Sequence, residues 1–436
     1  MQAGLSTKNA PSPSVVLPHY AFGAIAFVVA SILLFFGAKD FTILAFGPKI
    51  LSITHVLILG WVTVIIYGAL YQLIPVVMEV KLFNENLAYL SFGSILIGLS
   101  LMAYSFWNNY IGANLFIEIG GSLVIFSVLL FVINAVGSAL KSTNRGIENR
   151  FIITSIVWLL LTVLLGITII LNPIFQLIPR TNLDLLKIHL GFGLIGWFLM
   201  LVIGVGSTLM PMFFIAHKLQ KRYLNIAYVL INAGLILFSI SLYLKLSIFI
   251  TLFFSLLMIA GVLFFVKYNY DAYKKRLRRK LDIGMKLTVF AFPFLFLALI
   301  FGLLSIIDIE PINKMSTQFA LAFGASLILG FFTSLILGQM YKTLPFIVWL
   351  QKYQDKVGKF KIPLPNDIYS EKIADYHYYT FAVAIISLLI GILSKFEIII
   401  QISAVAFLIT ALLFTYNTFM IILHKEDTKA LNTNTK

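Results

Sequence analysis

The chain has 436 residues, of which 60% are hydrophobic and only 11% are charged. Apolar runs of about twenty residues recur along it, and each is long enough to cross a hydrocarbon core about 30 Å thick. The sequence contains no cysteine, which excludes a disulfide framework, thiolate metal sites, cysteine-ligated iron–sulfur clusters and the dithiolate of a binuclear copper centre for electron entry.

Taken in chain order, the apolar runs predict an all-α integral membrane protein with twelve transmembrane helices. Residues 1–16 lack the apolar stretch of a cleaved signal peptide, so the first apolar run is expected to be retained. The predicted spans are 17–38, 51–78, 87–107, 111–139, 151–171, 186–215, 223–243, 246–266, 287–306, 316–347, 376–394 and 397–423.

The basic residues predict how the chain is oriented. All but seven of the 32 Lys and Arg residues fall on the side that holds both termini and the loops after even-numbered spans; the seven are Lys39, Lys49, Arg180, Lys187, Lys245, Lys314 and Lys395. Because basic residues stay on the cytoplasmic side, we expect a multi-pass protein of the cell membrane with both termini in the cytoplasm.

The net charge of +15 reflects this bias together with attraction to anionic lipid headgroups, so membrane lipid is an expected partner. The most basic run, residues 274–280, lies between two predicted spans, and nucleic acid is therefore not an expected partner.

One string of residues occurs three times. A glycine and an aromatic residue are followed by a second glycine eight residues after the first and by a proline fifteen residues after it. The copies are Gly60-Trp61 with Gly68 and Pro75, Gly196-Trp197 with Gly204 and Pro211, and Gly330-Phe331 with Gly338 and Pro345. They fall on the second, sixth and tenth spans. We therefore expect a single polytopic domain, residues 1–436, built from three four-helix repeats at about 17–139, 151–266 and 287–423.

Two of these signature helices carry a histidine just before the glycine. His55 precedes Gly60 by five residues and His189 precedes Gly196 by seven, whereas the third copy has Ala325 and Phe323 at these offsets. The remaining histidines are predicted at the cytoplasmic ends of spans; they are His19, His217, His377 and His424. Only His55 and His189 are expected to share a site near the outer face of the membrane.

An imidazole inside a membrane is costly unless it is paired or coordinated, and neutral imidazole is a good ligand for heme iron, copper or zinc. The candidate metal ligands are therefore His55 and His189, and the candidate cofactor-binding residues beside them are Gly60, Trp61, Gly196 and Trp197. Glycine would let a flat macrocycle approach the backbone. The alternative is ordinary helix packing, with each histidine bonded to water or to a carbonyl.

These residues resemble those of a known family. Twelve spans in three four-helix arcs, with a histidine on the second span in the string H-x4-G-W…G-A-L-Y-Q-L-x-P and another on the sixth, look like the heme-copper oxidase subunit I superfamily. The resemblance is closest to its reduced relatives, the cytochrome oxidase subunit I-like proteins and the NnrS-like membrane hemoproteins linked to nitric oxide metabolism. It implies that His55 corresponds to an axial ligand of a low-spin heme and His189 to a copper ligand.

The sequence also departs from this family. Catalytic members carry a histidine pair on the seventh span and two histidines on the tenth, but residues 223–243 and 316–347 contain none, and Gly193 stands where one branch has a tyrosine. A complete binuclear heme-copper centre is therefore expected to be absent. The resemblance then implies heme b, with copper as a second option, held by His55 and His189 or by one of them with a non-histidine partner. Met315 and Gln318 are candidates for that partner.

Two functions from different classes follow. The first is a heme-binding membrane protein of respiratory or nitric-oxide-related redox metabolism, with a cytochrome or another respiratory-chain subunit as partner; an enzyme of this kind would be an oxidoreductase of the heme-copper oxidase or nitric oxide reductase type. The second is a cofactor-free scaffold subunit or transporter that keeps the twelve-helix architecture. A threefold repeat in one orientation weighs against common transporters, many of which are built from two halves.

Overall fold

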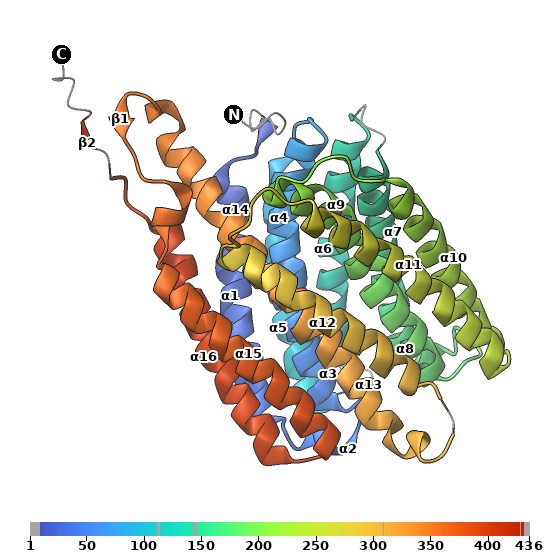
Figure 1. The fold of residues 1–436 in the computed structure, drawn as a ribbon. Coiled ribbons are helices and arrows are strands. Elements are labelled where there is room, and N and C mark those ends of the chain that lie inside the picture. The colour runs from blue at the N-terminus through green and yellow to red at the C-terminus, as the bar shows by residue number, and fades with distance from the viewer. Residues whose placement is uncertain (1–8, 111–113, 143–145, 308, 428, 431–436) are drawn as a thin grey trace. The chain divides into compact units, whose positions relative to one another are not determined.

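The structure, a computed structural model, describes residues 9–110, 114–142, 146–307, 309–427 and 429–430. Within these residues, twelve helical segments are long and apolar enough to span a membrane, so the prediction of an all-helical, multi-pass membrane protein is confirmed. Figure 1 shows the helices coloured along the chain.

Nine of the twelve spans are each formed by one α-helix. These are α1 (Pro13–Phe36), α5 (Glu85–Trp107), α6 (Leu115–Ala139), α7 (Ile147–Phe175), α10 (Arg222–Leu244), α11 (Ile248–Lys274), α12 (Ile283–Leu304), α15 (Glu371–Ser394) and α16 (Glu397–Ile422). A short helix, α2 (Asp40–Ile43), follows α1.

The three signature spans are composite, and each has a π-helical segment in its middle. The second span consists of α3 (Pro48–His55), η2 (Val56–Thr63) and α4 (Val64–Val77). The sixth consists of α8 (Asn182–Leu190), η3 (Gly191–Leu199) and α9 (Met200–Phe214). The tenth begins with the 3₁₀ turn η4 (Ile312–Met315) and continues as α13 (Ser316–Gly324), η5 (Ala325–Phe332) and α14 (Thr333–Tyr353).

Several helices begin at polar residues whose side chains accept a hydrogen bond from the first turn. Such a cap satisfies one of the backbone N–H groups that have no partner within the helix. The capping residues are Asn84 before α5, Asn114 before α6, Thr181 before α8, Asp282 before α12 and Ser370 before α15. These residues fix where the helices start, which hydropathy alone does not.

The chain divides into two compact units. Unit 1 contains residues 1–10 and 73–280, and unit 2 contains residues 11–72 and 281–436. The sequence repeats do not coincide with these units, because α5 and α6 of the first repeat belong to unit 1 together with α7–α11.

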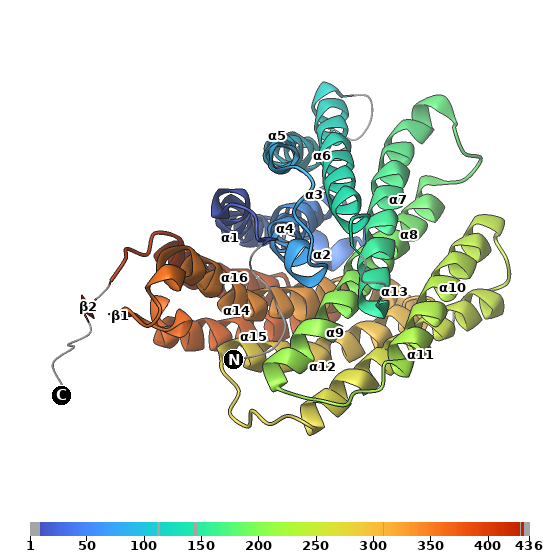
Figure 2. The ribbon, with the colours of Figure 1, turned by 90° about the horizontal axis from the view of Figure 1, so that it is seen from above.

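Unit 1 contains close contacts between helices that are neighbours along the chain. Ser91 on α5 and Ser127 on α6 donate hydrogen bonds to each other's backbone carbonyls, at 3.0 and 2.7 Å. A Cβ atom on Gly98 would lie 2.8 Å from the carbonyl oxygen of Gly120, so the two backbones approach closely at this point. Helix α8 contacts both α7 and α10 and lies between them (Figure 2).

Unit 2 is built from α1, the second span up to residue 72, and α12–α16. The Trp61 indole on η2 donates a hydrogen bond of 3.1 Å to the Thr333 hydroxyl at the start of α14, which joins two signature spans. The Lys342 ammonium on α14 pairs with the Asp282 carboxylate at the start of α12. Beyond α14, the chain forms the turns η6 (Gln354–Lys356) and η7 (Pro365–Ile368), and the two-residue strand β1 (Phe360–Lys361) pairs antiparallel with β2 (Lys429–Ala430).

The second glycine of each signature marks the place where another long helix of the same repeat crosses. An added Cβ would lie 2.7 Å from His19 Cβ at Gly68, 2.9 Å from Phe151 Cβ at Gly204 and 2.5 Å from the Gly284 carbonyl oxygen at Gly338. The helices that cross are α1, α7 and α12, which are the first helices of their repeats. The eight-residue spacing of the glycines therefore places a close helix crossing at the same point in all three copies.

Candidate functional site

The first glycine of each signature and its aromatic neighbour lie inside a π-helix. Gly60 and Trp61 fall in η2, Gly196 and Trp197 in η3, and Gly330 with its phenylalanine in η5. The π-helix is rare and occurs frequently at functional sites. A side-chain hydrogen bond follows the same wide turn. The Thr333 hydroxyl donates a 2.9 Å hydrogen bond to the carbonyl of Ile328, five residues earlier. Three copies at equivalent positions make this feature part of the repeat itself.

His55 is the last residue of α3, directly before η2. Its side chain is half-buried, and its Nδ1 lies 2.7 Å from the carbonyl oxygen of Leu51, one helical turn earlier. His189 is the penultimate residue of α8, two residues before η3, and is also half-buried. Its Nδ1 lies 3.0 Å from the carbonyl oxygen of Thr162 on α7.

The same contact therefore orients both imidazole rings. A carbonyl oxygen can only accept, so Nδ1 carries the proton and Nε2 carries the ring's lone pair. This is the arrangement in which a metal-ligating histidine is held by its other nitrogen. Both rings fit the requirement for a neutral imidazole ligand that binds a metal or a heme iron through Nε2.

Glycine also brings α7 close to His189. An added Cβ on Gly166 would lie 3.2 Å from His189 Cε1, so only glycine at this position leaves the ring where it is. The ring therefore lies against the α7 backbone, between Gly166 and the Thr162 carbonyl.

The other candidate cofactor residues lie deep in the two units. Trp61 is fully buried, and its ring stacks on Phe27 with centroids 4.7 Å apart. Trp197 is also buried, and its indole N–H has no hydrogen-bond partner in the part of the chain that the structure describes. Gly196 is covered by Trp158 of α7, whose ring would lie 2.6 Å from an added Cβ. The third copy repeats this contact, since Phe294 covers Gly330 at 2.6 Å.

Of the two candidate partners in the third copy, Gln318 lies in the first turn of α13 and is buried, and Met315 caps that helix and is half-buried. The Gln318 Oε1 atom has no hydrogen-bond partner among the described residues. His55 and Gln318 belong to unit 2 and His189 belongs to unit 1. Ligation of one metal by both histidines stays a prediction.

Within the described residues, no group of three or more His, Cys, Asp or Glu side chains is arranged to hold a metal ion. A heme differs from a bare metal ion in this respect, because its porphyrin supplies four nitrogen ligands and the protein adds one or two axial ones.

Two other histidines are more buried than the sequence predicted. His19 lies in the second turn of α1, where its ring meets Tyr71 with centroids 5.5 Å apart. His377 lies in the second turn of α15, packs against Tyr341 at 5.5 Å, and its Nε2 has no hydrogen-bond partner among the described residues. The sequence does carry a signal for this region, since Tyr71 and Tyr341 occupy the same column of the repeat, eleven residues after the glycine.

Comparison with known proteins bears on the fold. No family model matches the chain. An uncharacterised protein of Aquifex aeolicus (strain VF5) is 27% identical over 315 residues, which cover 69% of this chain and 72% of that protein. A chain of a heme-copper terminal oxidase dimer, solved by cryo-electron microscopy, aligns with a TM-score of 0.68 at 11% identity over 96% of this chain and 85% of that chain. The protein therefore has the fold of a heme-copper terminal oxidase, which confirms the predicted fold class.

Proposed function

We propose that the protein is a heme-binding membrane protein of respiratory or nitric-oxide-related redox metabolism, with the oxidase fold but without a complete binuclear heme-copper site. His55 and His189, or one of them with a non-histidine partner, are the proposed axial ligands, a b-type heme is the proposed cofactor, and copper is the second option at His189. The proposal includes a location in the cell membrane with both termini in the cytoplasm, where a cytochrome or another respiratory-chain subunit would be the redox partner.

One observation carries this proposal. His55 is the residue before η2 and His189 is two residues before η3, in two copies of one repeat, and both direct Nδ1 at a backbone carbonyl, at 2.7 and 3.0 Å. His377 makes a similar contact, with its Nδ1 2.9 Å from the Ala374 carbonyl oxygen, so what sets His55 and His189 apart is their place beside a π-helix in two copies of the repeat. The shared feature is a neutral ring whose Nε2 is the ligating nitrogen.

The protein's own residues would bind and orient the cofactor. The Leu51 and Thr162 carbonyls fix the two imidazole planes and raise the basicity of Nε2. Burial of Trp61 and Trp197 excludes water from the signature helices. When bound, a b-type heme supplies one-electron transfer and, where one axial position is open, binding of a diatomic gas.

Absorption spectroscopy of variants tests the proposal. We expect the purified protein to show the α-band of a reduced b-type heme, and His55→Ala or His189→Ala to abolish or shift it. His217→Ala is the matched control, because His217 is exposed and lies outside the signature helices. A spectrum that both signature variants leave unchanged would contradict the assignment of these ligands.

A second function, a cofactor-free scaffold subunit, has an observation in its favour. Trp158 covers Gly196 and Phe294 covers Gly330, so these two glycines serve contacts between helices. This function predicts a colourless protein in which His55→Ala and His189→Ala fold normally. The same spectra therefore separate the two functions.

A further inference from the structure

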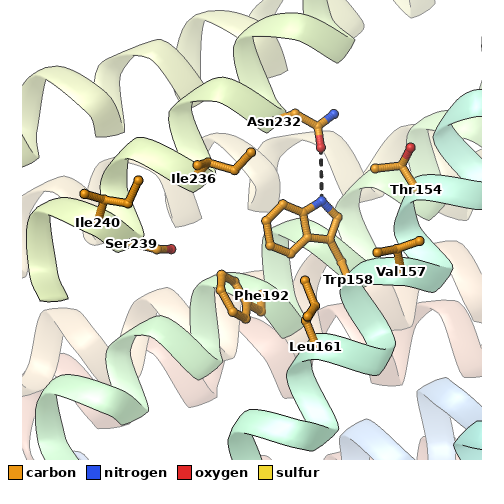
Figure 3. Close-up of a pocket in the computed structure, with 9 residues that line it drawn as sticks. All are labelled: Thr154, Val157, Trp158, Leu161, Phe192, Asn232, Ile236, Ser239 and Ile240. Carbon is orange, nitrogen blue, oxygen red and sulfur yellow. Dashed lines mark hydrogen bonds between the residues drawn. The ribbon is translucent and has the colours of Figure 1, made fainter. Parts of the chain in front are cut away.

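A pocket of about 450 Å³ lies between α7, η3 and α10 in unit 1 (Figure 3). Thr154, Val157, Trp158 and Leu161 line it from α7, Phe192 from η3, and Asn232, Ile236, Ser239 and Ile240 from α10. Along α10 it extends from Asn232 to Ile240, or about 12 Å at the rise of an α-helix. One leaflet of a hydrocarbon core is about 15 Å deep, so a groove of this length matches a large part of one acyl chain.

The polar side chains in this groove already bond to one another. The Trp158 indole donates to Asn232 Oδ1 at 3.0 Å, and the Asn232 amide donates to the Tyr228 carbonyl at 2.9 Å. The Thr154 hydroxyl is 2.8 Å from the Tyr228 hydroxyl, and the Ser239 hydroxyl donates to the Leu235 carbonyl at 2.8 Å. With these groups engaged, the rest of the lining is hydrocarbon, so the occupant that fits is apolar along its length.

Basic side chains gather where α7 and α10 begin. Lys221 of α10 pairs with Glu148 of α7 at 2.7 Å, which places the two helix starts side by side. Arg150 precedes Thr154 by one helical turn and shares the face of α7 that carries Val157 and Leu161. It therefore lies at the end of the groove nearest the start of α7. Arg150 and Arg222 are both exposed. One carboxylate among three basic groups leaves a positive surplus at this end of the groove.

We propose that this groove binds one acyl chain of an anionic phospholipid, whose phosphate lies against Arg150 and Arg222. The positive charges of the two arginines favour an anionic headgroup, and the apolar lining of the groove favours an acyl chain. A quinone is a poorer fit, since it carries no charge and would gain nothing from the two arginines at the end of the groove. The lining of the groove includes neither signature histidine, and the lipid titration below does not depend on the presence of heme.

Native mass spectrometry of the full-length protein in mild detergent tests this proposal. Phosphatidylglycerol and phosphatidylcholine with the same acyl chains are added in separate titrations. We expect wild type to retain one phosphatidylglycerol molecule in preference to phosphatidylcholine. Arg150→Gln should weaken phosphatidylglycerol binding about fivefold, the loss expected for one basic side chain at an anionic surface, and leave phosphatidylcholine binding unchanged. Arg279→Gln, a change at another exposed arginine, should bind as wild type does.

A second pair of variants tests the groove itself. Ile236→Trp fills the pocket, whereas Leu256→Trp adds the same ring to an exposed position of α11 (Ile248–Lys274) outside the pocket lining; the two side chains are 47% and 51% exposed. Ile236→Trp should abolish retention of the lipid, and Leu256→Trp should not, with equal melting temperatures as the check on folding. Equal retention of the two lipids by wild type, or unchanged retention in Ile236→Trp or Arg150→Gln, would overturn the proposal. A quinone or detergent found in place of the phospholipid would do so as well.

Discussion

Two imidazole rings in this protein are held by the same kind of contact, although the contact comes from different places. Leu51, which accepts from His55, lies four residues earlier in the same helix, so this partner follows from helical geometry. Thr162, which accepts from His189, lies on another helix and twenty-seven residues away, and depends on the packing of α8 against α7. The sequence singled out these two histidines as candidates, and it could not predict how the second ring is held.

Gly196 allows a residue-scale prediction. An alanine Cβ at this position would lie 2.6 Å from the Trp158 ring, which is closer than packed atoms allow. Because the Trp158 Cβ also lies only 2.8 Å away and the indole is hydrogen-bonded to Asn232, the side chain cannot simply swing aside, and Gly196→Ala should lower the free energy of unfolding by about 1–3 kcal/mol, as measured by denaturation in detergent micelles.

Gly93→Ala is the control for this change. Nothing lies within 4 Å of an added Cβ on Gly93, which is exposed on α5. Alanine is preferred over glycine in a helix by up to about 1 kcal/mol, so this variant should be neutral or slightly more stable. Equal losses of stability in the two variants would show that the contact between Trp158 and Gly196 is not tightly packed.

At the scale of the element, the sequence predicted every span but placed some of the starts too late. Helix α1 begins at Pro13 and α15 follows the Ser370 cap, whereas the predicted spans begin at residues 17 and 376. Hydropathy misses these first turns because Ser12, Glu371 and Lys372 are polar, yet their backbone is helical or caps a helix. As a result, His19 and His377 lie in the second turns of their helices and are buried, rather than at the span ends.

The π-helices lay beyond sequence analysis for a related reason. The signature segments are apolar on all sides, so the register of the helix leaves no trace in the hydrophobic pattern. The recurring Gly-aromatic pair marked the correct place on each span, but only the backbone geometry shows that the turn there is wider. Each copy of the string thus coincides with a π-helix, a feature that the prediction did not contain.

The segment after α16 supports a prediction about pH. His424 Nε2 lies 2.8 Å from the hydroxyl of the buried Tyr353, which in turn accepts from the Asp427 amide at 2.9 Å. Burial, followed by the nearby Lys352 ammonium, lowers the pKa of His424 below its ordinary value of 6.5. Neutral His424 is therefore favoured in the folded state, and this stabilisation is complete above pH 6.5 and is lost as the pH falls toward the folded-state pKa.

We therefore expect the chain after α16 to detach from Tyr353 on acidification. Between about pH 7.5 and about pH 5.5, which bracket the ordinary histidine pKa, tryptic cleavage after the exposed Lys425 should become faster in wild type than in His424→Gln. Glutamine keeps a hydrogen-bond acceptor but does not titrate. The ratio of the two rates cancels the pH dependence of trypsin, and a constant ratio would contradict the role given to His424.

At the scale of the whole molecule, each compact unit packs several apolar helices against one another. A charged side chain buried among them is costly to stability unless an opposite charge pairs with it. The Lys342 and Asp282 side chains of unit 2 are 9% and 17% exposed. Removing one partner of such a pair leaves an uncompensated charge, so Lys342→Met should lower the free energy of unfolding by about 3–5 kcal/mol. Chemical denaturation in micelles measures this loss.

The exposed pair Lys314 and Glu310 is the matched control, because its side chains are 68% and 70% exposed. Water screens such a pair, and Lys314→Met should change the free energy of unfolding by less than about 1 kcal/mol. A loss in Lys342→Met no larger than that in Lys314→Met would mean that water reaches Asp282 in the folded protein.

The fold of the whole molecule was the most predictable property, because twelve apolar spans and a threefold string define an architecture by themselves. The 11% identity to the terminal oxidase of the same fold explains why the site was less predictable. So few shared residues preserve helix packing, whereas a site depends on particular side chains. This sequence has one histidine in each of two signature helices and none in the third.

The most direct test of heme binding is the ratio of heme to protein. The full-length protein, produced with an ample heme supply and purified in mild detergent, would be assayed as its pyridine hemochrome against an independent protein measurement. We predict a b-type heme at a ratio near one per chain. A well-folded protein that contains no heme under these conditions would contradict the proposed function and favour the cofactor-free scaffold.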